Sequence, residues 1–195
     1  MTTIKTPYHK GNLREALIEA GIDLIRERGP DALTIRGAAA RVGVSHAAPK
    51  HHFPSLEALR TAVAIEGHRR FAAEMEAAIA EADPGPRAAL IAAGIGYIRF
   101  ARSHPGLFHV MFSGVIDRDD PGLQAAAGVS YGVLAGVSAA VVHGPAGAEG
   151  TETLVWSLAH GFSALMLGGK DELQDPLRAE AIFRQIFPAL PLRDA

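Results

Sequence analysis

The helical spacing of apolar residues is the feature that most constrains this chain. Leu13, Leu17, Ala20 and Leu24 recur at intervals of three and four residues, which places them on one face of a helix. Similar patterns continue along most of the chain, and no alternating pattern typical of a β-strand has a useful length. The predicted fold class is therefore all-α, with about nine helices.

Glycine and proline divide this pattern into separate helices. Gly29-Pro30 ends the first helix, since glycine suits a left-handed cap and proline cannot continue a helix. The strongest internal break is Asp83-Pro84-Gly85-Pro86. We expect an N-terminal domain over residues 8–55, a linking helix over 56–82 and a C-terminal helical domain over 84–190. The expected helices cover approximately residues 13–28, 34–41, 45–52, 56–82, 87–103, 107–112, 123–142, 149–167 and 176–187.

The composition narrows the possible functions. The chain has no cysteine, which excludes disulfides, thiolate zinc sites and a cysteine nucleophile. Its formal net charge is −2, yet basic residues outnumber acidic ones up to Phe53 and acidic residues dominate after it. A basic N-terminal part on an acidic remainder suits a protein that binds nucleic acid through one end. The alternative is a chance asymmetry.

Two segments bear on cellular location. The stretch from Met1 to Lys10 is polar and lacks the apolar core of a secretory signal. The stretch from Leu123 to Val142 has no formal charge, but its alanine, glycine and serine content makes it weakly hydrophobic for a membrane span. We expect a cytoplasmic protein in which this stretch is a buried helix, with no membrane partner.

The segment Thr34 to Phe53, with the sequence TIRGAAARVGVSHAAPKHHF, is the most informative about function. It predicts two short helices joined by a tight turn at Gly43, with small residues at Ala39 and Ala40 where the helices must cross closely. This pattern is typical of a helix-turn-helix, whose second helix enters the major groove of DNA. An ordinary helical hairpin is the alternative.

Several motifs resemble the tetracycline-repressor (TetR) family of bacterial regulators. In the first third of the chain they are Tyr8-His9-Lys10-Gly11-Asn12-Leu13, Arg28-Gly29, Leu33-Thr34-Ile35-Arg36, Val42-Gly43-Val44-Ser45, His52-Phe53 and Glu57-Ala58-Leu59. Later segments, His104-Pro105-Gly106-Leu107-Phe108 and Trp156-Ser157-Leu158-Ala159-His160-Gly161, resemble a C-terminal domain type of that family named for its Trp-His-Gly signature.

This resemblance implies a homodimeric, all-helical repressor that binds double-stranded operator DNA and is released by a small-molecule effector. It also implies eight DNA-contacting residues: Thr34, Arg36, Ser45, His46, Ala47, Lys50, His51 and His52. The first two would start a helix beside a phosphate, the next three would face base edges, and the last three would face the backbone or the bases. The effector, the operator and the regulated genes cannot be read from the sequence, and activation is as open as repression.

The chain departs from the family pattern at three positions, of which only Lys50 is among these eight. Lys50 stands where the family usually has tyrosine, and Leu56 where it often has lysine. Gly37 replaces an acidic residue, and glycine inside a helix costs about 1 kcal/mol relative to alanine. Pro49 lies in the first turn of the predicted second helix, where few hydrogen bonds are lost. These departures bear on affinity and operator sequence.

The C-terminal part should hold the effector pocket and the dimer interface. Nine aromatic and methionine residues are candidates to line the pocket, although such residues more often form plain core: Phe71, Met75, Tyr97, Phe100, Phe108, Met111, Phe112, Tyr131 and Trp156. The dimer face is expected on the two C-terminal helices, with small residues for close approach and larger ones for apolar area: Ala159, Ser163, Ala164, Gly168, Leu154, Leu158, Leu165, Ile182, Phe183 and Ile186.

Nothing in the sequence points to catalysis, a cofactor or a metal. The histidines outside the N-terminal domain lack the spacing of a metal site, and no Walker loop, nucleophile elbow or dinucleotide fingerprint occurs. We therefore expect a regulator and no enzyme. Two alternatives remain: a small-molecule-binding protein or enzyme that is all-helical and does not bind DNA, and a helical adaptor that dimerises without DNA.

Overall fold

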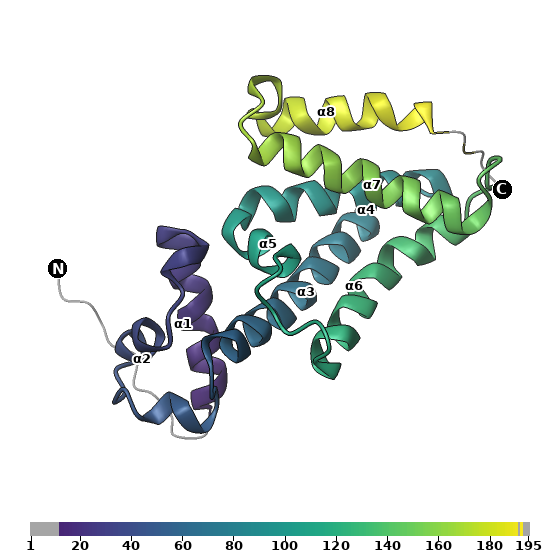
Figure 1. Cartoon of the computed structure of the whole chain (residues 1–195). Coiled ribbons are helices and arrows are strands. Elements are labelled where there is room, and N and C mark those ends of the chain that lie inside the picture. Colours follow the sequence, from purple (N-terminus) through teal and green to yellow (C-terminus); the bar gives the residue numbers. More distant parts are fainter. Residues whose placement is uncertain (1–11, 191, 193–195) are drawn as a thin grey trace. The chain divides into compact units, whose positions relative to one another are not determined.

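The computed structural model describes residues 12–190 and Leu192, and it confirms the all-α fold (Figure 1). Within this part of the chain there is no β-strand, and no helix is long and apolar enough to cross a membrane. The predicted family match at Tyr8–Gly11 and the first residues of the predicted domain 8–55 lie outside the described residues. The α-helices are α1 (Leu13–Arg28), α2 (Ile35–Val42), α3 (Leu56–Ala80), α4 (Pro86–Ser103), α5 (Pro105–Phe112), α6 (Pro121–Ala139), α7 (Gly147–Leu167) and α8 (Pro176–Ile186).

The described residues form eight of the nine expected α-helices, and the exception is the segment 45–52. Here the chain forms turns and a 3-10 helix, η2 (Ala48–His51), with hydrogen bonds between residues three apart, such as Lys50 N to Ala47 O at 3.2 Å. Pro49 has no backbone N–H, so it cannot donate to Ser45 as an α-helix would require. The prediction of an α-helix for this segment was therefore wrong, while the predicted turn before it is present.

The chain divides into two compact units. Unit 1 holds the residues up to Gly67 together with 106–123, and unit 2 holds 68–105 together with the residues from Gln124 onward. Helix α3 begins in unit 1 and ends in unit 2. Unit 1 thus contains α1, α2, η2 and most of α5, and unit 2 contains α4, α7, α8 and most of α6.

Unit 1 has its core around α1. Leu17 and Ile25 are almost completely buried, and so are Leu33 and Phe53 from the segments that pack on this helix. Glycine permits two close approaches: a Cβ on Gly21 would lie 2.9 Å from the Leu33 side chain, and one on Gly106 would lie 2.5 Å from Ile25. Both α2 and η2 pack against α1.

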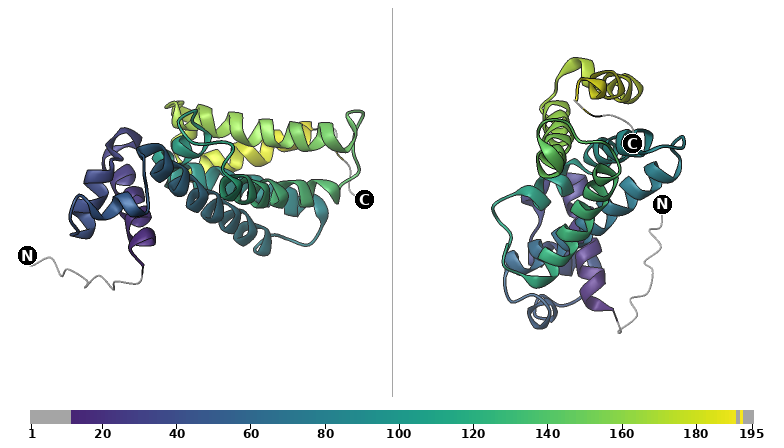
Figure 2. Two further views of the ribbon diagram at one scale, coloured as in Figure 1. Left: turned by 60° about the horizontal axis from the view of Figure 1, so that its bottom comes forward. Right: turned by 90° about the vertical axis from the view of Figure 1, so that its right-hand side faces the viewer.

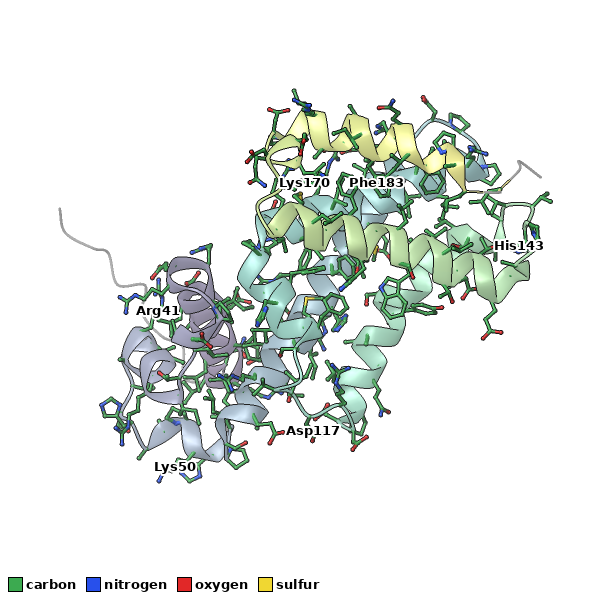
Figure 3. All side chains as sticks on the ribbon, turned by 45° about the horizontal axis from the view of Figure 1, so that its top comes forward. Arg41, Lys50, Asp117, His143, Lys170 and Phe183 are labelled. Carbon is green, nitrogen blue, oxygen red and sulfur yellow. The ribbon has the colours of Figure 1, made fainter. Side chains whose placement is uncertain are left out.

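Unit 2 is built around α4, which packs against both α7 and α8 (Figure 2). Two glycines allow close contacts in this unit. A Cβ on Gly96 would lie only 2.7 Å from the Cα of Met75, and one on Gly94 only 2.5 Å from the Phe183 ring. Phe183 is fully buried between helices and meets Phe162 edge-on at 5.4 Å between ring centroids (Figure 3). Aromatic and apolar burial supplies most of the stability of such a bundle.

Candidate nucleic-acid interface

The predicted DNA-contacting residues begin at the N-terminus of α2. Thr34 caps this helix, since its Oγ1 accepts a hydrogen bond from the Gly37 backbone N–H at 3.0 Å. Arg36, two residues on, is exposed. The free N–H groups and the positive end of the dipole at this terminus suit a phosphate beside Thr34 and Arg36.

The turn after α2 is closed by glycine, as the sequence predicted. Gly43 has a left-handed backbone, with φ at 81°, and donates to the carbonyls of Ala39 and Ala40. The Val44 N–H also donates to the Ala39 carbonyl, which completes a Schellman-type helix end. This turn sends the chain directly into the segment with the remaining predicted contacts.

The segment after the turn presents its polar side chains outward. Ser45, His46, Ala47, Lys50, His51 and His52 are all exposed. Pro49 and Phe53 are buried and anchor the segment to unit 1, and the Arg14 guanidinium lies over the Phe53 ring, 5.5 Å from its centroid. Lys50 projects from η2 at the surface (Figure 3). A short, outward-facing backbone with cationic and hydrogen-bonding side chains can contact both phosphates and base edges.

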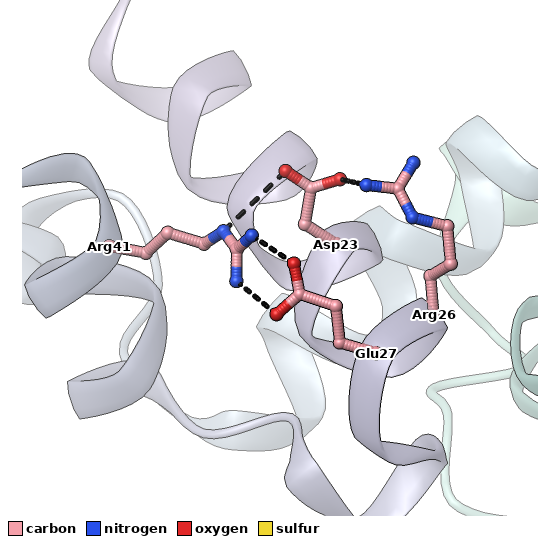
Figure 4. Close-up of polar contacts among 4 residues, drawn as sticks. All are labelled: Asp23, Arg26, Glu27 and Arg41. Atoms are coloured by element: carbon pink, nitrogen blue, oxygen red, sulfur yellow. Dashed lines mark hydrogen bonds and ion pairs between the residues drawn. The ribbon is translucent and has the colours of Figure 1, made fainter. Parts of the chain in front are cut away.

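An ion network fixes the end of α2 to α1 (Figure 4). Both terminal nitrogens of the Arg41 guanidinium bond the Glu27 carboxylate, one of them at 2.8 Å, and its Nε lies 3.5 Å from Asp23, which also binds Arg26 at 2.6 Å. The hydrogen bond from Arg41 lowers the pKa of Glu27, and Glu27 raises the pKa of Arg41. Arg41 and Arg26 are thus paired with acids, whereas Arg36 and Lys50 make no ion pair with another described residue.

Gly37 has a structural purpose that the sequence did not reveal. A Cβ at this position would lie 2.8 Å from the Thr34 Oγ1 and 3.1 Å from the Leu24 side chain. The glycine therefore lets α2 pack against α1 beneath its own cap. The contact with Leu24 joins two helices, so the sequence pattern around Gly37 did not reveal that part of it.

The nine predicted pocket residues are divided between the two units. Phe108, Met111 and Phe112 belong to unit 1, and the other six belong to unit 2. Within unit 2, Phe71, Met75, Tyr97 and Phe100 are buried, and the Phe71 ring meets those of Tyr97 and Phe100 at 4.6 and 5.1 Å between centroids. Tyr131 and Trp156 are about 40% exposed and contact one another edge-on at 5.8 Å.

Uncharged polar groups lie among these rings. The His68 Nδ1 is 2.9 Å from the Ser130 hydroxyl, and the Tyr97 hydroxyl is 2.8 Å from the His160 Nδ1. Burial lowers the pKa of His68 to about 4, lowers that of His160 and raises that of Tyr97. All three groups are therefore neutral at physiological pH, so this interior offers hydrogen bonds without formal charge. His68 and Ser130 were missed as candidates, because a single polar residue in an apolar pattern carries no distinguishing signal. His160 belongs to the Trp-His-Gly signature but was not among the predicted pocket residues.

The two C-terminal helices expose an apolar stripe that differs in part from the predicted one. On α7, Leu154, Leu158, Gly161 and Leu165 repeat at intervals of four, three and four residues, and Leu154 and Leu165 are 40% and 58% exposed. On α8, Ile186 is 36% exposed. Three predicted members, Ala159, Ser163 and Phe183, are fully buried inside unit 2, so the prediction was wrong for these. They face α4 or neighbouring helices of their own chain.

No cluster of three or more histidine, aspartate or glutamate side chains that could hold a metal ion occurs within residues 12–190. Arg36 and Lys50 are the two cations of the predicted contact set, and hydroxyl or imidazole groups make up its other polar side chains. This chemistry suits hydrogen bonding and charge pairing, and phosphate oxygens and base edges offer matching partners.

Comparison with known families gives two matches on the chain. Residues 17–63 match the model of the bacterial regulatory proteins of the tetR family, and residues 90–190 match the model of a tetracyclin repressor-like C-terminal domain. The first match includes α2, the Gly43 turn and η2, and the second includes most of unit 2. Together they cover the candidate interface and the part of the interior that lies on α4 and α7.

Individual relatives agree with these matches. An uncharacterised HTH-type transcriptional regulator of Mycobacterium tuberculosis is 29% identical over 176 residues, or 87% of this chain and 76% of the relative. A solved structure of a protein of unknown function from Rhodococcus sp. RHA1 is 27% identical, with a TM-score of 0.79 over 95% of this chain and 99% of the other. A tetR-family regulator from Shewanella sp. PV-4 shares the fold at 16% identity, with a TM-score of 0.67 over 93% and 100% of the two chains.

Proposed function

The chain belongs to the tetR family of bacterial regulatory proteins and is a DNA-binding transcriptional regulator, and from this premise we propose that it acts as a ligand-responsive repressor. In this proposal a homodimer binds double-stranded operator DNA, and a small-molecule effector releases it. Such a regulator acts on chromosomal DNA in the cytoplasm and needs no catalytic step and no cofactor. The observation that carries the proposal is the exposed, cationic segment from Ser45 to His52, which the Gly43 turn presents beside the capped start of α2.

We assign the DNA contacts by the chemistry of the side chains. Thr34 and Arg36 bind a phosphate at the N-terminus of α2, while Ser45, His46 and Ala47 approach base edges in the major groove. Lys50, His51 and His52 contact the backbone or bases. Lysine in place of the family's tyrosine binds phosphate as a mobile point charge, so affinity at this position depends more on salt and less on geometry.

The stripe on α7 supports dimerisation through the two C-terminal helices. Leucine at intervals of four and three residues is the pattern of helices that pack in pairs. Gly161 lies within this stripe, and nothing of its own chain lies within 4 Å of a Cβ placed there. A two-fold axis across this face would let α7 of each subunit approach its symmetry mate closely. The proposed interface consists of Leu154, Leu158, Gly161, Ala164, Leu165 and Gly168 with Ile182 and Ile186 of α8.

The interior of unit 2 supports an effector site. The rings of Phe71, Tyr97 and Phe100 provide apolar surface, and the neutral pairs around Tyr97 and His68 provide hydrogen bonds. Ligand sites typically combine a mostly apolar lining with a few fixed polar groups. Tyr131 and Trp156, which are partly exposed, extend the same lining toward the surface. Phe108, Met111 and Phe112 lie in unit 1 and are not part of this proposed site.

The proposed mechanism is a change of spacing. A dimer can contact two half-sites when the Ser45–His52 segments of its two subunits lie about 34 Å apart, which is one turn of DNA. An effector that binds more tightly to a state with another spacing lowers the affinity for DNA by the coupling free energy, typically about 1–3 kcal/mol.

The direct test uses the full chain and DNA from upstream of its own gene. Fluorescence anisotropy should show saturable, salt-sensitive binding to that DNA and weaker binding to a scrambled duplex of equal length. Lys50→Ala should weaken binding and flatten the salt dependence by about one phosphate contact. Lys170→Ala, which removes an exposed lysine of unit 2, is the matched control and should bind as the wild type does.

The opposite results would identify the alternatives. Equal and salt-insensitive anisotropy with both duplexes would contradict the repressor proposal and favour an all-helical protein that binds small molecules without DNA. A protein that binds the specific duplex and raises transcription from it in a purified system would be an activator. The Gly161→Phe variant should be monomeric in analytical ultracentrifugation while its helix content is unchanged, and a dimer of this variant would contradict the proposed interface.

A further inference from the structure

Unit 2 contains a cavity whose lining shares no residue with the aromatic interior. It has a volume of about 340 Å³ and is formed where the end of α3, the first half of α4 and the helix α8 meet. Small side chains create the hollow, and isoleucines complete its apolar part: Ala78, Ala82, Ala88, Ala92, Ile91 and Ile95. This volume is at the lower end of the range for ligand pockets, so it suits a small molecule.

The charged side chains of this cavity are not all paired. The Arg99 guanidinium is taken up by Glu180, with Nε and Nη2 at 2.8 and 2.9 Å from its two carboxylate oxygens, and it also lies 3.9 Å from Glu81. Arg184 and Asp83 line the same cavity, and neither makes an ion pair with another described residue. Among the described residues, the cavity thus has one cation, Arg184, and one acid, Asp83, that are not in ion pairs, beside a short aliphatic surface.

We propose that this cavity binds a small zwitterion with an aliphatic side chain, that is, an α-amino acid of the size of valine, leucine or isoleucine. The ligand carboxylate pairs with Arg184, which presents several donors in a planar fork. The ligand ammonium pairs with Asp83 and Glu81. The aliphatic side chain covers Ile91 and the alanines of α4.

The charge balance of the cavity selects this class of ligand. A simple carboxylate would gain Arg184 but would stand beside Glu81 and Asp83, and a simple amine would gain the acids but would stand beside Arg184. A ligand charge next to a like charge of the protein weakens binding, while one next to an opposite charge strengthens it. A molecule with both groups satisfies both sides of the cavity. Each additional methylene buried on the isoleucines and alanines should strengthen binding about fourfold.

Isothermal titration calorimetry of the full-length protein with L-leucine tests the proposal. We expect saturable binding with a dissociation constant of about 1 mM or lower. Glycine, which lacks the aliphatic part, should bind at least about tenfold more weakly. The same loss is expected for 4-methylpentanoate, which lacks the ammonium group, and for 3-methylbutylamine, which lacks the carboxylate.

Single substitutions at residues that line the cavity test where leucine binds. Arg184→Gln should weaken leucine binding at least about tenfold, whereas Arg178→Gln, an equal loss of charge at an exposed position of the same helix, should leave it unchanged. Ala88→Leu fills the hollow and should abolish binding. Asp83→Asn should narrow the difference between leucine and 4-methylpentanoate. Circular dichroism melting of each variant confirms that it is folded.

Three results would overturn the proposal. The first is no saturable binding of leucine, valine or isoleucine by the folded wild type. The second is unchanged leucine binding in folded Arg184→Gln, which would place the ligand elsewhere, for example in the aromatic interior. The third is 4-methylpentanoate binding as tightly as leucine, which would make the site a carboxylate site without need of the ammonium group.

Discussion

The segment 34–53 of unit 1 and the helical bundle of unit 2 both have a helical sequence pattern, yet different interactions stabilise them. In unit 1, α2 buries only Ala38 and Ala39 and depends on a cap at Thr34, a glycine turn at Gly43 and an ion network through Arg41. In unit 2, α4 is buried from Ala92 to Ile98 and packs against α7 and α8, whose Phe162 and Phe183 rings meet edge-on.

The proposed role of residues 34–53 in contacting DNA accounts for this difference. A segment that reads DNA must keep its outer face free, so it cannot bury that face for stability. Local polar devices, each worth about 1 kcal/mol or less, then fix its backbone. The bundle has no such restriction and can use large apolar side chains, each worth several times as much. The two regions should therefore respond very differently to single substitutions.

The largest effect is expected in the bundle at Phe183. This ring is completely buried and packs against Phe162, Phe187 and Gly94. Phe183→Ala should lower the free energy of unfolding by about 3–5 kcal/mol, because it removes buried area and leaves a cavity. Urea denaturation followed by circular dichroism measures the loss.

A control on the same helix separates burial from helix propensity. Leu177 is 80% exposed, so Leu177→Ala should change the stability by less than about 0.5 kcal/mol. A loss at Phe183 no greater than that at Leu177 would show that the bundle is not held by its aromatic core. The comparison between the two units would then fail.

A second large effect in the bundle depends on pH. Burial lowers the pKa of His68 to about 4, so the unfolded chain binds a proton at this residue more readily than the folded chain. Stability from this source is fully present above the ordinary histidine pKa of about 6.5 and falls as the pH drops toward 4, by about 3 kcal/mol in all.

Urea midpoints of the wild type and of His68→Gln between pH 7 and pH 4.5 measure this dependence. The variant should lose less stability than the wild type over the same interval, because glutamine does not titrate. His109→Gln, a change at an exposed histidine, is the control and should follow the wild type. Parallel curves for His68→Gln and the wild type would refute the assignment.

The same contrast explains how far the sequence alone could lead. The Thr34 cap, the Gly43 turn and the helix end at Gly29-Pro30 each depend on residues close together in the sequence, so all three were predicted correctly. Pro49 was underestimated: its missing N–H turns the expected α-helix into a 3-10 helix. Gly37 was interpreted as a weak point of α2, whereas in the structure a Cβ there would crowd both the Thr34 hydroxyl and the Leu24 side chain.

The details of unit 2 depend on contacts between distant parts of the chain, which periodicity does not reveal. Phe183 and Ser163 carry the residue types of an interface but are buried within the unit. The hydrogen bond of His68 with Ser130 joins residues 62 positions apart, and that of Tyr97 with His160 joins residues 63 apart. Periodicity predicted which segments are helical, but it could not tell which face of each helix meets which neighbour.

A smaller effect is expected at the cap of α2. Thr34→Ala leaves the Gly37 N–H without its partner at 3.0 Å and should cost about 1 kcal/mol of stability. Thr34→Ser keeps the hydroxyl and should recover most of the loss. Hydrogen exchange measured by mass spectrometry should show faster exchange in α2 of Thr34→Ala and unchanged exchange in α4. Equal acceleration in both helices would mean that the cap stabilises the whole chain instead of α2.

The smallest effect is expected from the ion network between α2 and α1. Glu27→Gln removes one carboxylate from the Arg41 guanidinium, but both side chains are about one third exposed, so water and salt weaken the pair. The loss of stability should be smaller than that of Thr34→Ala and should nearly vanish at about 1 M salt. Because Arg41 lowers the pKa of Glu27, the contribution is present at neutral pH and is lost as the pH falls through that lowered value. A double-mutant cycle with Arg41→Gln isolates the pair, and a coupling as large as the effect of the cap would show that charges, and not the cap, hold α2 in place.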